Sequence, residues 1–282
     1  MEDLVVRGTA DLRLREMAAW VIPHRLWEGR RRWSELRSSG CSVRRSARVA
    51  VSGRRTNALV NTRLELLPGR LLDDVGIVID VGANIGEWTA GVLQLAEPTQ
   101  VFAFEPSPRV FPLLMGRFAD NQVVNVIQAA VGDVDSTIPF YVTEHSHNAS
   151  VLQPRADVQD LLDHGGSVED RVDVDVVRLD TVLADVPSID ILKIDVQGYE
   201  RSVLAGAPKT LAKTKWALLE ANFVSLYDDD LLLAELNDLM VRAGFTLANL
   251  SQPYVRKGTA MFADALYRRD GASGARTQTS SG

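Results

Sequence analysis

A short apolar run that ends on a carboxylate and leads into a glycine turn constrains this chain more than any other feature. Residues 77–81 read IVIDV, residues 82–86 read GANIG, and a helix-like segment follows over 87–95. A buried strand is typically such a run bounded by turn residues, and glycines permit the tight turn. The three segments therefore predict a strand–turn–helix unit with a ligand site at the carboxyl end of the strand.

Strand-like and helix-like segments alternate over most of the remaining chain. Further strands are predicted at 100–105, 123–131, 138–145, 172–179, 189–196, 215–221, 245–250 and 261–269, and helices at 106–120, 199–211 and 229–243. This alternation predicts an α/β fold with a mostly parallel sheet and helices on both faces.

The two ends of the chain differ in composition from this central part. Residues 1–63 hold 14 arginines, no lysine and 6 acids, for a net charge of +8, whereas residues 64–282 carry a net charge of −14. Stretch 11–37 is predicted to be helical, with a break at Pro23. We therefore expect a basic, partly helical arm and linker (1–63), one domain (64–269) and a disordered tail (270–282).

Several classes of protein are disfavoured by the sequence. It lacks a run of about 18 apolar residues, so we expect no membrane-spanning helix. The single cysteine, Cys41, argues against a disulfide framework and a cysteine-based zinc site. The first residues lack the apolar core of a secretory signal, which favours a cytoplasmic location. Arginines and tryptophans in the arm leave open a peripheral membrane contact, packing on the body, or a homo-oligomer.

The glycine turn and the acids around it predict a nucleoside cofactor. Asn84 stands where a dinucleotide fingerprint has its second glycine, and Gly82 and Gly86 lie four apart, which disfavours pyrophosphate binding. Asp80 closes the first strand, and Glu105 closes the second, where an acid can accept hydrogen bonds from ribose hydroxyls. This pattern is typical of S-adenosyl-L-methionine (SAM) sites, with Asp80 toward the methionine end. The alternative interpretation is that these residues are ordinary glycine turns and strand-end acids of an unrelated α/β domain.

Another acid follows the third predicted strand, in Ala130-Val131-Gly132-Asp133. In SAM-binding folds an acid at this point often meets the adenine amine, so Asp133 is a further cofactor candidate. A solvated turn aspartate is the alternative interpretation.

The chain resembles the FkbM family of SAM-dependent methyltransferases. The resemblance is carried by IDVGANIGEWT (79–89), FEPSP (104–108), AVGD (130–133), RLDTVL (178–183) and LKIDVQGYERSVLAGA (192–207), and it covers about residues 74–268. It implies a Rossmann-like class I fold with a mixed seven-stranded sheet in the order 3-2-1-4-5-7-6. It also implies O-methylation of hydroxyls on polyketides, sugars or glycolipids. Many members carry glutamate at the position of Gln197, so we assign that side chain no role.

Methyl transfer to a hydroxyl requires positioning of the reactants. It also requires either a general base that accepts the hydroxyl proton or a cation that stabilises the developing alkoxide. Asp195 ends the strand of the KIDVQGYE segment and is a candidate base or cofactor contact. Lys193 lies on the same side of that strand, is a further catalytic candidate and is expected to pair with Asp195. Glu200 is expected either to cap the next helix or to hold a substrate hydroxyl. A shared ion pair of Lys193 and Glu200 that shapes the turn is the alternative for both.

Additional polar candidates lie on the same rim of the predicted sheet. Glu220 is a catalytic candidate and Asn222 a substrate contact, although a strand-end acid that binds nearby backbone is an equal alternative for both. His147 is a candidate base and His145 a candidate substrate contact. Two surface histidines are the alternative to a metal-binding pair, and no metal site is predicted.

These observations lead to one leading hypothesis and two alternatives. We expect a SAM-dependent O-methyltransferase that acts on a small-molecule or glycolipid acceptor. An RNA or protein methyltransferase guided by the basic arm is the second hypothesis, although the charge of −14 on residues 64–282 disfavours nucleic acid. A non-catalytic assembly module that keeps the SAM-binding fold is the third.

Overall fold

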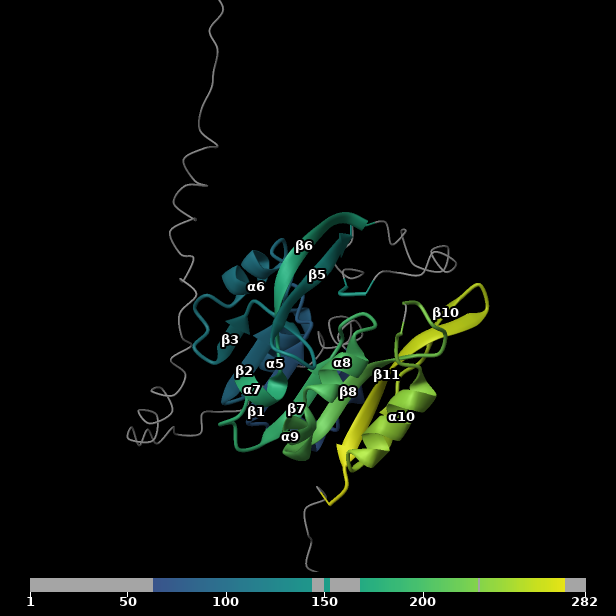
Figure 1. Ribbon diagram of the computed structural model, residues 1–282. Coiled ribbons are helices and arrows are strands. Elements are labelled where there is room, and N and C mark those ends of the chain that lie inside the picture. The colour runs from purple at the N-terminus through teal and green to yellow at the C-terminus, as the bar shows by residue number, and fades with distance from the viewer. Residues whose placement is uncertain (1–62, 144–149, 153–167, 228, 272–282) are drawn as a thin grey trace, which may run out of the picture. The chain divides into compact units, whose positions relative to one another are not determined.

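The computed structural model describes residues 63–143, 150–152, 168–227 and 229–271, all within the unit 51–282. An eight-stranded sheet forms its centre (Figure 1) in the order β10-β11-β8-β7-β1-β2-β3, with β9 also paired to β11. The strands are β1 (Ile77–Val81), β2 (Gln100–Phe104), β3 (Val124–Ile127), β7 (Ile189–Ile194), β8 (Thr214–Asn222), β9 (Phe245–Leu250), β10 (Tyr254–Arg256) and β11 (Thr259–Arg269).

The sheet is mixed, as the sequence predicts. Strands β3, β2, β1, β7 and β8 run parallel to one another, and β11 runs antiparallel to β8, β9 and β10. Counting β7, β8, β9 and β11 as strands four to seven reproduces the predicted order 3-2-1-4-5-7-6, so this prediction is confirmed. The short strand β10 is an addition that the sequence pattern does not indicate.

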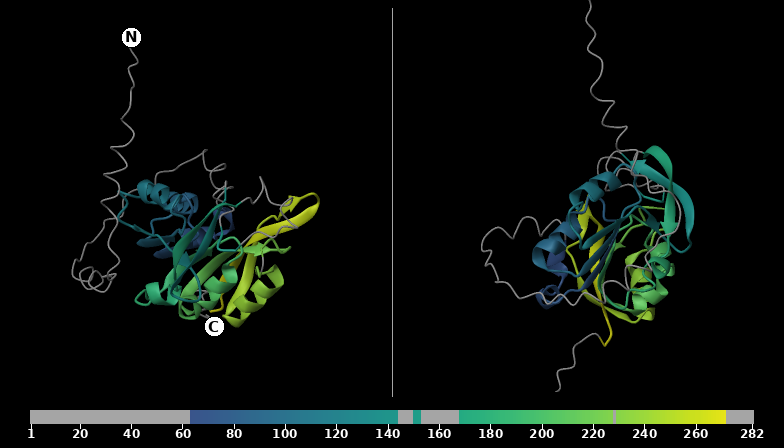
Figure 2. Two further views of the ribbon diagram at one scale, coloured as in Figure 1. Left: turned by 45° about the horizontal axis from the view of Figure 1, so that its top comes forward. Right: turned by 90° about the vertical axis from the view of Figure 1, so that its left-hand side faces the viewer.

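Helices cover both faces of the sheet (Figure 2), which confirms the predicted Rossmann-like class I architecture. On one face lie α5 (Glu87–Leu95) and α6 (Phe111–Arg117); on the other lie α8 (Glu200–Ala205), α9 (Pro208–Ala212) and α10 (Leu233–Arg242). Trp88 and Val92 of α5 pack in one apolar cluster with Val78 and Val101. Short elements η2 (Leu64–Leu66), α4 (Gly69–Leu72) and α7 (Leu179–Val182) complete the described helices.

A second, three-stranded sheet was not expected from the sequence. It contains β4 (Ala130–Val131), β6 (Val168–Val177) and β5 (Ser136–Thr143), in the order β4-β6-β5. The single strand predicted over 123–131 is therefore wrong: β3 and β4 belong to different sheets, and the Ala129 N–H donates to the Ile127 carbonyl in the turn between them (3.1 Å). A continuous apolar run conceals such a change of direction, because both halves are apolar.

The single helix predicted over 199–211 is also wrong, because α8 and α9 are separate. Gly206 ends α8, and Pro208 is the first residue of α9, where its missing N–H costs nothing. A Cβ at Gly206 would overlap the carbonyl oxygen of Gly132, so the break lets this glycine pack directly on the turn after β4.

The basic arm up to residue 62 and the tail from residue 272 lie outside the described residues. Their predicted helix, linker and partner contacts therefore stay predictions, as do the domain boundaries. Among the helices that the structure does describe, none has both the length and the apolar character of a membrane span.

Candidate functional site

A cavity of about 380 Å³ opens at the carboxyl ends of β1, β2, β7 and β8. Its volume lies within the range of about 300–1,000 Å³ that is usual for small-molecule sites. Six residues singled out in the sequence line it: Gly82, Asn84, Glu105, Lys193, Asp195 and Glu220. Parallel strands end at one edge of the sheet, and this brings together six residues that are up to 138 positions apart in the chain.

The turn after β1 has a backbone that few other residues could adopt. Gly82 and Gly86 have φ angles of +76° and +79°, and Asn84 has a φ of +50°. A Cβ on Gly82 would overlap the carbonyl oxygen of Asp195, and one on Gly86 would meet the ring of Phe118. The glycines therefore bring the turn against β7 and start α5, while Asn84 tolerates the left-handed region.

Glu105 is held in place by the backbone at both of its carboxylate oxygens. Oε2 accepts the Asn84 N–H and Oε1 accepts the Ser107 N–H, each at 2.9 Å. Burial raises the pKa of Glu105 to about 7, against the effect of these two hydrogen bonds. Each carboxylate oxygen keeps a second acceptor position, so Glu105 can bind a pair of neighbouring hydroxyls.

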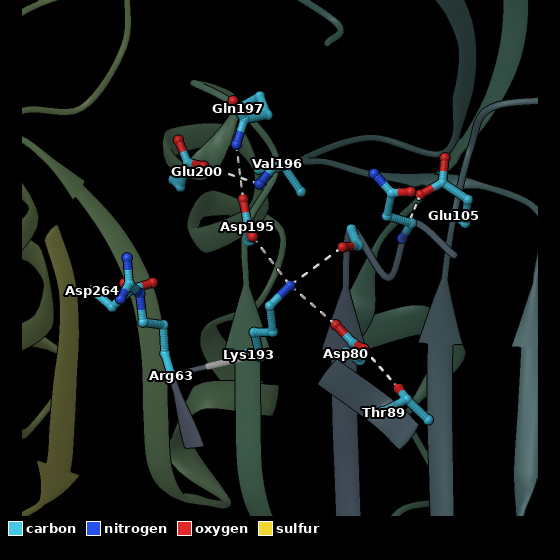
Figure 3. Close-up of polar contacts among 12 residues, drawn as sticks. Arg63, Asp80, Thr89, Glu105, Lys193, Asp195, Val196, Gln197, Glu200 and Asp264 are labelled. Atoms are coloured by element: carbon cyan, nitrogen blue, oxygen red, sulfur yellow. Dashed lines mark hydrogen bonds and ion pairs between the residues drawn. The ribbon is translucent and has the colours of Figure 1, made fainter. Parts of the chain in front are cut away.

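A buried ammonium group, that of Lys193, links β1 and β7 (Figure 3). Its Nζ lies 3.2 Å from Asp80 Oδ1 and 3.4 Å from Asp195 Oδ2, and it donates to the Gly82 carbonyl oxygen at 3.3 Å. Asp80 also accepts a hydrogen bond from the Thr89 hydroxyl (2.7 Å) and is completely buried. Burial alone would lower the pKa of Lys193, but Asp80 and Asp195 outweigh it, so this pKa lies above its ordinary value. Lys193 is therefore a fixed cation at neutral pH.

Gln197, to which the sequence assigned no role, connects Asp195 to the interior. Its Nε2 donates to Asp195 Oδ1 (3.0 Å), and its Oε1 accepts the Tyr227 hydroxyl (3.2 Å). The Ser150 hydroxyl donates to the Gln197 backbone carbonyl (2.7 Å). An amide can donate to one partner while it accepts from another, which a carboxylate cannot do. An amide at position 197 thus matches the two partners that Gln197 has here.

Three carboxylates lie side by side on adjacent strands facing the cavity. Glu220 on β8 is the register partner of Asp264 on β11, and Asp195 directly follows β7, the other neighbour of β8. Arg63 Nε lies 2.8 Å from Asp264 Oδ2 (Figure 3). Burial raises the pKa of Glu220 well above its ordinary value, and Asp195 adds to that effect. Burial likewise raises the pKa of Asp264.

Arg63 and Asp264 were missed in the sequence. Arg63 was counted with the arm, and Asp264 lies inside a strand-like run with no motif around it. An acid at an inward position of an apolar strand was the available signal for Asp264.

Two of the predicted substrate residues lie outside the lining of the cavity. Glu200 Oε1 accepts the Val196 N–H (3.1 Å) of the turn that precedes α8, and its predicted roles as a helix cap or a substrate contact stay predictions. Its side chain is buried, and burial raises the pKa of Glu200 to about 7. Asn222 is also buried, at the end of β8 beside Phe262.

The remaining candidates are not tested by the structure. Asp133 is exposed and accepts a hydrogen bond from the Ser202 hydroxyl (3.2 Å), and its adenine contact stays a prediction. His145 and His147 lie outside the described residues. In the part of the chain that is described, no three His, Cys, Asp or Glu side chains converge as metal ligands would.

The cavity suits the nucleoside cofactor that the sequence predicts. Glu105 offers acceptors for a ribose diol, Ile85, Pro106 and Val131 offer apolar surface for a base, and Asp195 offers negative charge for a cationic group. These acceptors, apolar groups and the negative charge match the ribose hydroxyls, the adenine ring and the cationic groups of SAM.

Comparison with known proteins gives a consistent picture. Residues 80–247 match the sequence model of one family, described as the methyltransferase FkbM domain. The 2-O-methyltransferase NoeI of Sinorhizobium fredii is 28% identical over 173 residues, which are 58% of this chain and 70% of that protein. The 31-O-demethyl-FK506 methyltransferase FkbM of Streptomyces tacrolimicus is 29% identical over 213 residues, which are 67% of this chain and 78% of that protein.

Among solved structures, a methyltransferase FkbM from Methylobacillus flagellatus aligns with 18% sequence identity and a TM-score of 0.48. The alignment covers 74% of this chain and 47% of that one, so this chain spans about half of its length. The fold assignment rests on the sheet topology described above.

Proposed function

The chain belongs to the FkbM family of SAM-dependent methyltransferases, and on this premise we propose that it methylates a hydroxyl oxygen of a sugar, glycolipid or polyketide-type acceptor. Two relatives support oxygen as the target, because their names specify a 2-O-methyltransferase and a methyltransferase of 31-O-demethyl-FK506. The single observation that carries the proposal is that Asp195 and Glu220 line the same cavity as the turn that starts at Gly82.

We propose that Glu105 holds the cofactor's ribose and that the turn from Gly82 to Ile85 passes along it. When bound, SAM supplies a methyl group on a sulfonium sulfur. Asp195 is already fixed by Gln197 and by Lys193, so its carboxylate needs no reorganisation to face a cationic group or an acceptor hydroxyl.

We assign proton acceptance to Glu220. A general base works best when its pKa is near the working pH, and burial moves the pKa of Glu220 upward from its ordinary value. Asp195 lies beside it and can orient the same hydroxyl. Lys193, as a fixed cation beside Asp195, offsets part of the negative charge that develops on the acceptor oxygen as its proton moves to Glu220.

The first experiment identifies the acceptor. Metabolites and glycolipids of a deletion strain are compared by mass spectrometry with those of the parent strain, and we expect a product that is lighter by one CH₂ group. This lighter compound, purified from the deletion strain, should accept a methyl group from SAM in the presence of the enzyme. A deletion strain with an unchanged metabolite profile, together with no SAM binding by calorimetry, would refute the proposal.

The second experiment separates the roles of the two acids. Glu220→Gln should keep its affinity for S-adenosylhomocysteine and lose roughly 10²- to 10⁴-fold in kcat, the usual effect of losing a general base. Glu235→Gln is the matched control, because Glu235 is an exposed residue of α10 that pairs with Arg201. Asp195→Asn tests whether Asp195 contacts the cofactor. A lower cofactor affinity together with a lower kcat would assign Asp195 to the cofactor. Full activity of Glu220→Gln would contradict its assignment as the base.

A further inference from the structure

We infer that the part of the cavity formed by β8, β10 and β11 binds an uncharged sugar ring, stacked against Tyr254 and Phe262. This inference rests on the proposed function, and it narrows the acceptor to one chemical class. It is carried by an aromatic surface and a row of polar groups that line the same cavity.

The aromatic surface is a stacked pair on the β10–β11 hairpin. Tyr254 and Phe262 are register partners, with ring centroids 5.1 Å apart and an interplanar angle of 22°. Both rings are half-buried, line the cavity, and pack against the buried Leu226 and Met261. The underlying core thus holds this stacked pair in place at the cavity, where the C–H face of a pyranose ring can pack against the outer face of a ring.

The polar row lies on the same face of the sheet as this pair. Phe262 and Asp264 are two positions apart on β11, so their side chains point to the same side, and Glu220 is the register partner of Asp264. Arg63 contacts Asp264 and also lines the cavity. Carboxylates accept hydrogen bonds from hydroxyls, so the row offers several acceptors to a polyhydroxylated ring.

Other acceptor classes fit these groups less well. A wholly apolar acceptor would take Glu220 and Asp264 out of water without giving them hydrogen bonds, which is unfavourable. An anionic acceptor would meet the negative charges of Asp195, Glu220 and Asp264, while Arg63 is already paired with one of them. The combination therefore selects against both and favours a neutral ring with several hydroxyls.

Saturation-transfer NMR on the full chain with S-adenosylhomocysteine bound tests the inference. The probes are methyl glycosides of glucose, N-acetylglucosamine, fucose and rhamnose, with cyclohexanol as an apolar alcohol of similar ring size. We expect transfer to the C–H protons of at least one glycoside and none to cyclohexanol. Tyr254→Ala should lower the affinity for that glycoside roughly two- to tenfold, the usual range for one aromatic contact.

Val255→Ala is the matched control, since Val255 is the next residue on β10 and is 56% exposed. Asp264→Asn provides a second variant that removes a charge without removing bulk, and it should also lower the affinity for the glycoside. Calorimetry with S-adenosylhomocysteine on every variant verifies that each one is folded and binds the cofactor product.

The outcomes separate this inference from the proposed function. Binding of S-adenosylhomocysteine with transfer to cyclohexanol only, with transfer to no probe, or with equal glycoside affinity in Tyr254→Ala and Val255→Ala overturns the sugar subsite and leaves methyl transfer standing. Failure of the wild-type chain to bind S-adenosylhomocysteine refutes the proposed function and this inference with it.

Discussion

Replacing Lys193 with methionine tests whether this lysine is the cation that balances the buried acids. Methionine keeps most of the length of the side chain and removes its charge and donors. The Lys193 side chain is 12% exposed, and its Nζ lies 3.2 Å from Asp80 Oδ1, whose side chain is fully buried. In the variant, Asp80 would keep the hydrogen bond from Thr89 and lose its only nearby cation among the described residues.

Breaking one partner of a buried ion pair usually costs about 3–5 kcal/mol, because an uncompensated charge remains in the interior. We therefore expect the free energy of unfolding of Lys193→Met to fall by about 3–5 kcal/mol at pH 7. For a domain of this size, that loss corresponds to a decrease in Tm of roughly 6–20 °C.

The pH dependence of the wild-type lysine has a definite sign. Burial opposes the charge on Lys193, but Asp80 and Asp195 raise its pKa above the ordinary value. A raised pKa of a basic group stabilises the fold at every pH below the unfolded value of about 10.4, and the effect is lost only above that. A measurement at pH 7 therefore captures the whole contribution.

Lys215→Met is the matched control for this experiment. Lys215 lies on the neighbouring strand β8, with Nζ 2.6 Å from Asp190 Oδ1, but its side chain is 51% exposed. Asp190 also keeps the N–H groups of Gly76 and Ile77 as partners, so the control should lose less than about 1 kcal/mol.

The assay is urea unfolding followed by tryptophan fluorescence, for which the buried Trp88 is a reporter. The expected result is a lower midpoint for Lys193→Met with an unchanged slope, and a nearly wild-type curve for Lys215→Met. If the two variants lose equal stability, each within about 1 kcal/mol of the wild type, the assignment of Lys193 as the balancing cation is refuted.

Three further predictions concern the turns around the cavity. Burial raises the pKa of Glu200 to about 7, so the folded state binds this proton more tightly than the unfolded state, and the free energy of unfolding should fall as pH rises from about 4.5 to 7. In Glu200→Gln, urea titrations should show a weaker dependence of stability on pH, and an unchanged dependence would contradict this prediction. Gly82→Ala should abolish cofactor binding in calorimetry, because its Cβ overlaps a backbone carbonyl, whereas Gly116→Ala in α6 meets nothing within 4 Å and should bind normally. Gln197→Glu should put a second carboxylate beside Asp195 and lower the free energy of unfolding by roughly 1–3 kcal/mol at pH 8 and by less at pH 6. An equal loss of stability at both pH values would count against this electrostatic reasoning.

The sequence by itself determined the type of fold and the cofactor turn. The run 77–81, the glycine turn and the helix that follows were predicted correctly, because backbone preference and apolar periodicity act over a few neighbouring residues. The predicted strand order also agrees with the structure, through the family resemblance. Local patterns were misleading at 123–131 and 199–211, where a change of direction depends on packing against distant segments.

Only the tertiary structure decided which polar groups meet. Arg63 and Asp264 are 201 positions apart and pair because Arg63, directly before η2, lies beside the middle of β11. The bridge from Tyr227 through Gln197 to Asp195 and the acidic row across β7, β8 and β11 likewise depend on strand register. Sequence patterns report which residues face a common side of one element, while contacts between elements follow from how the whole core packs.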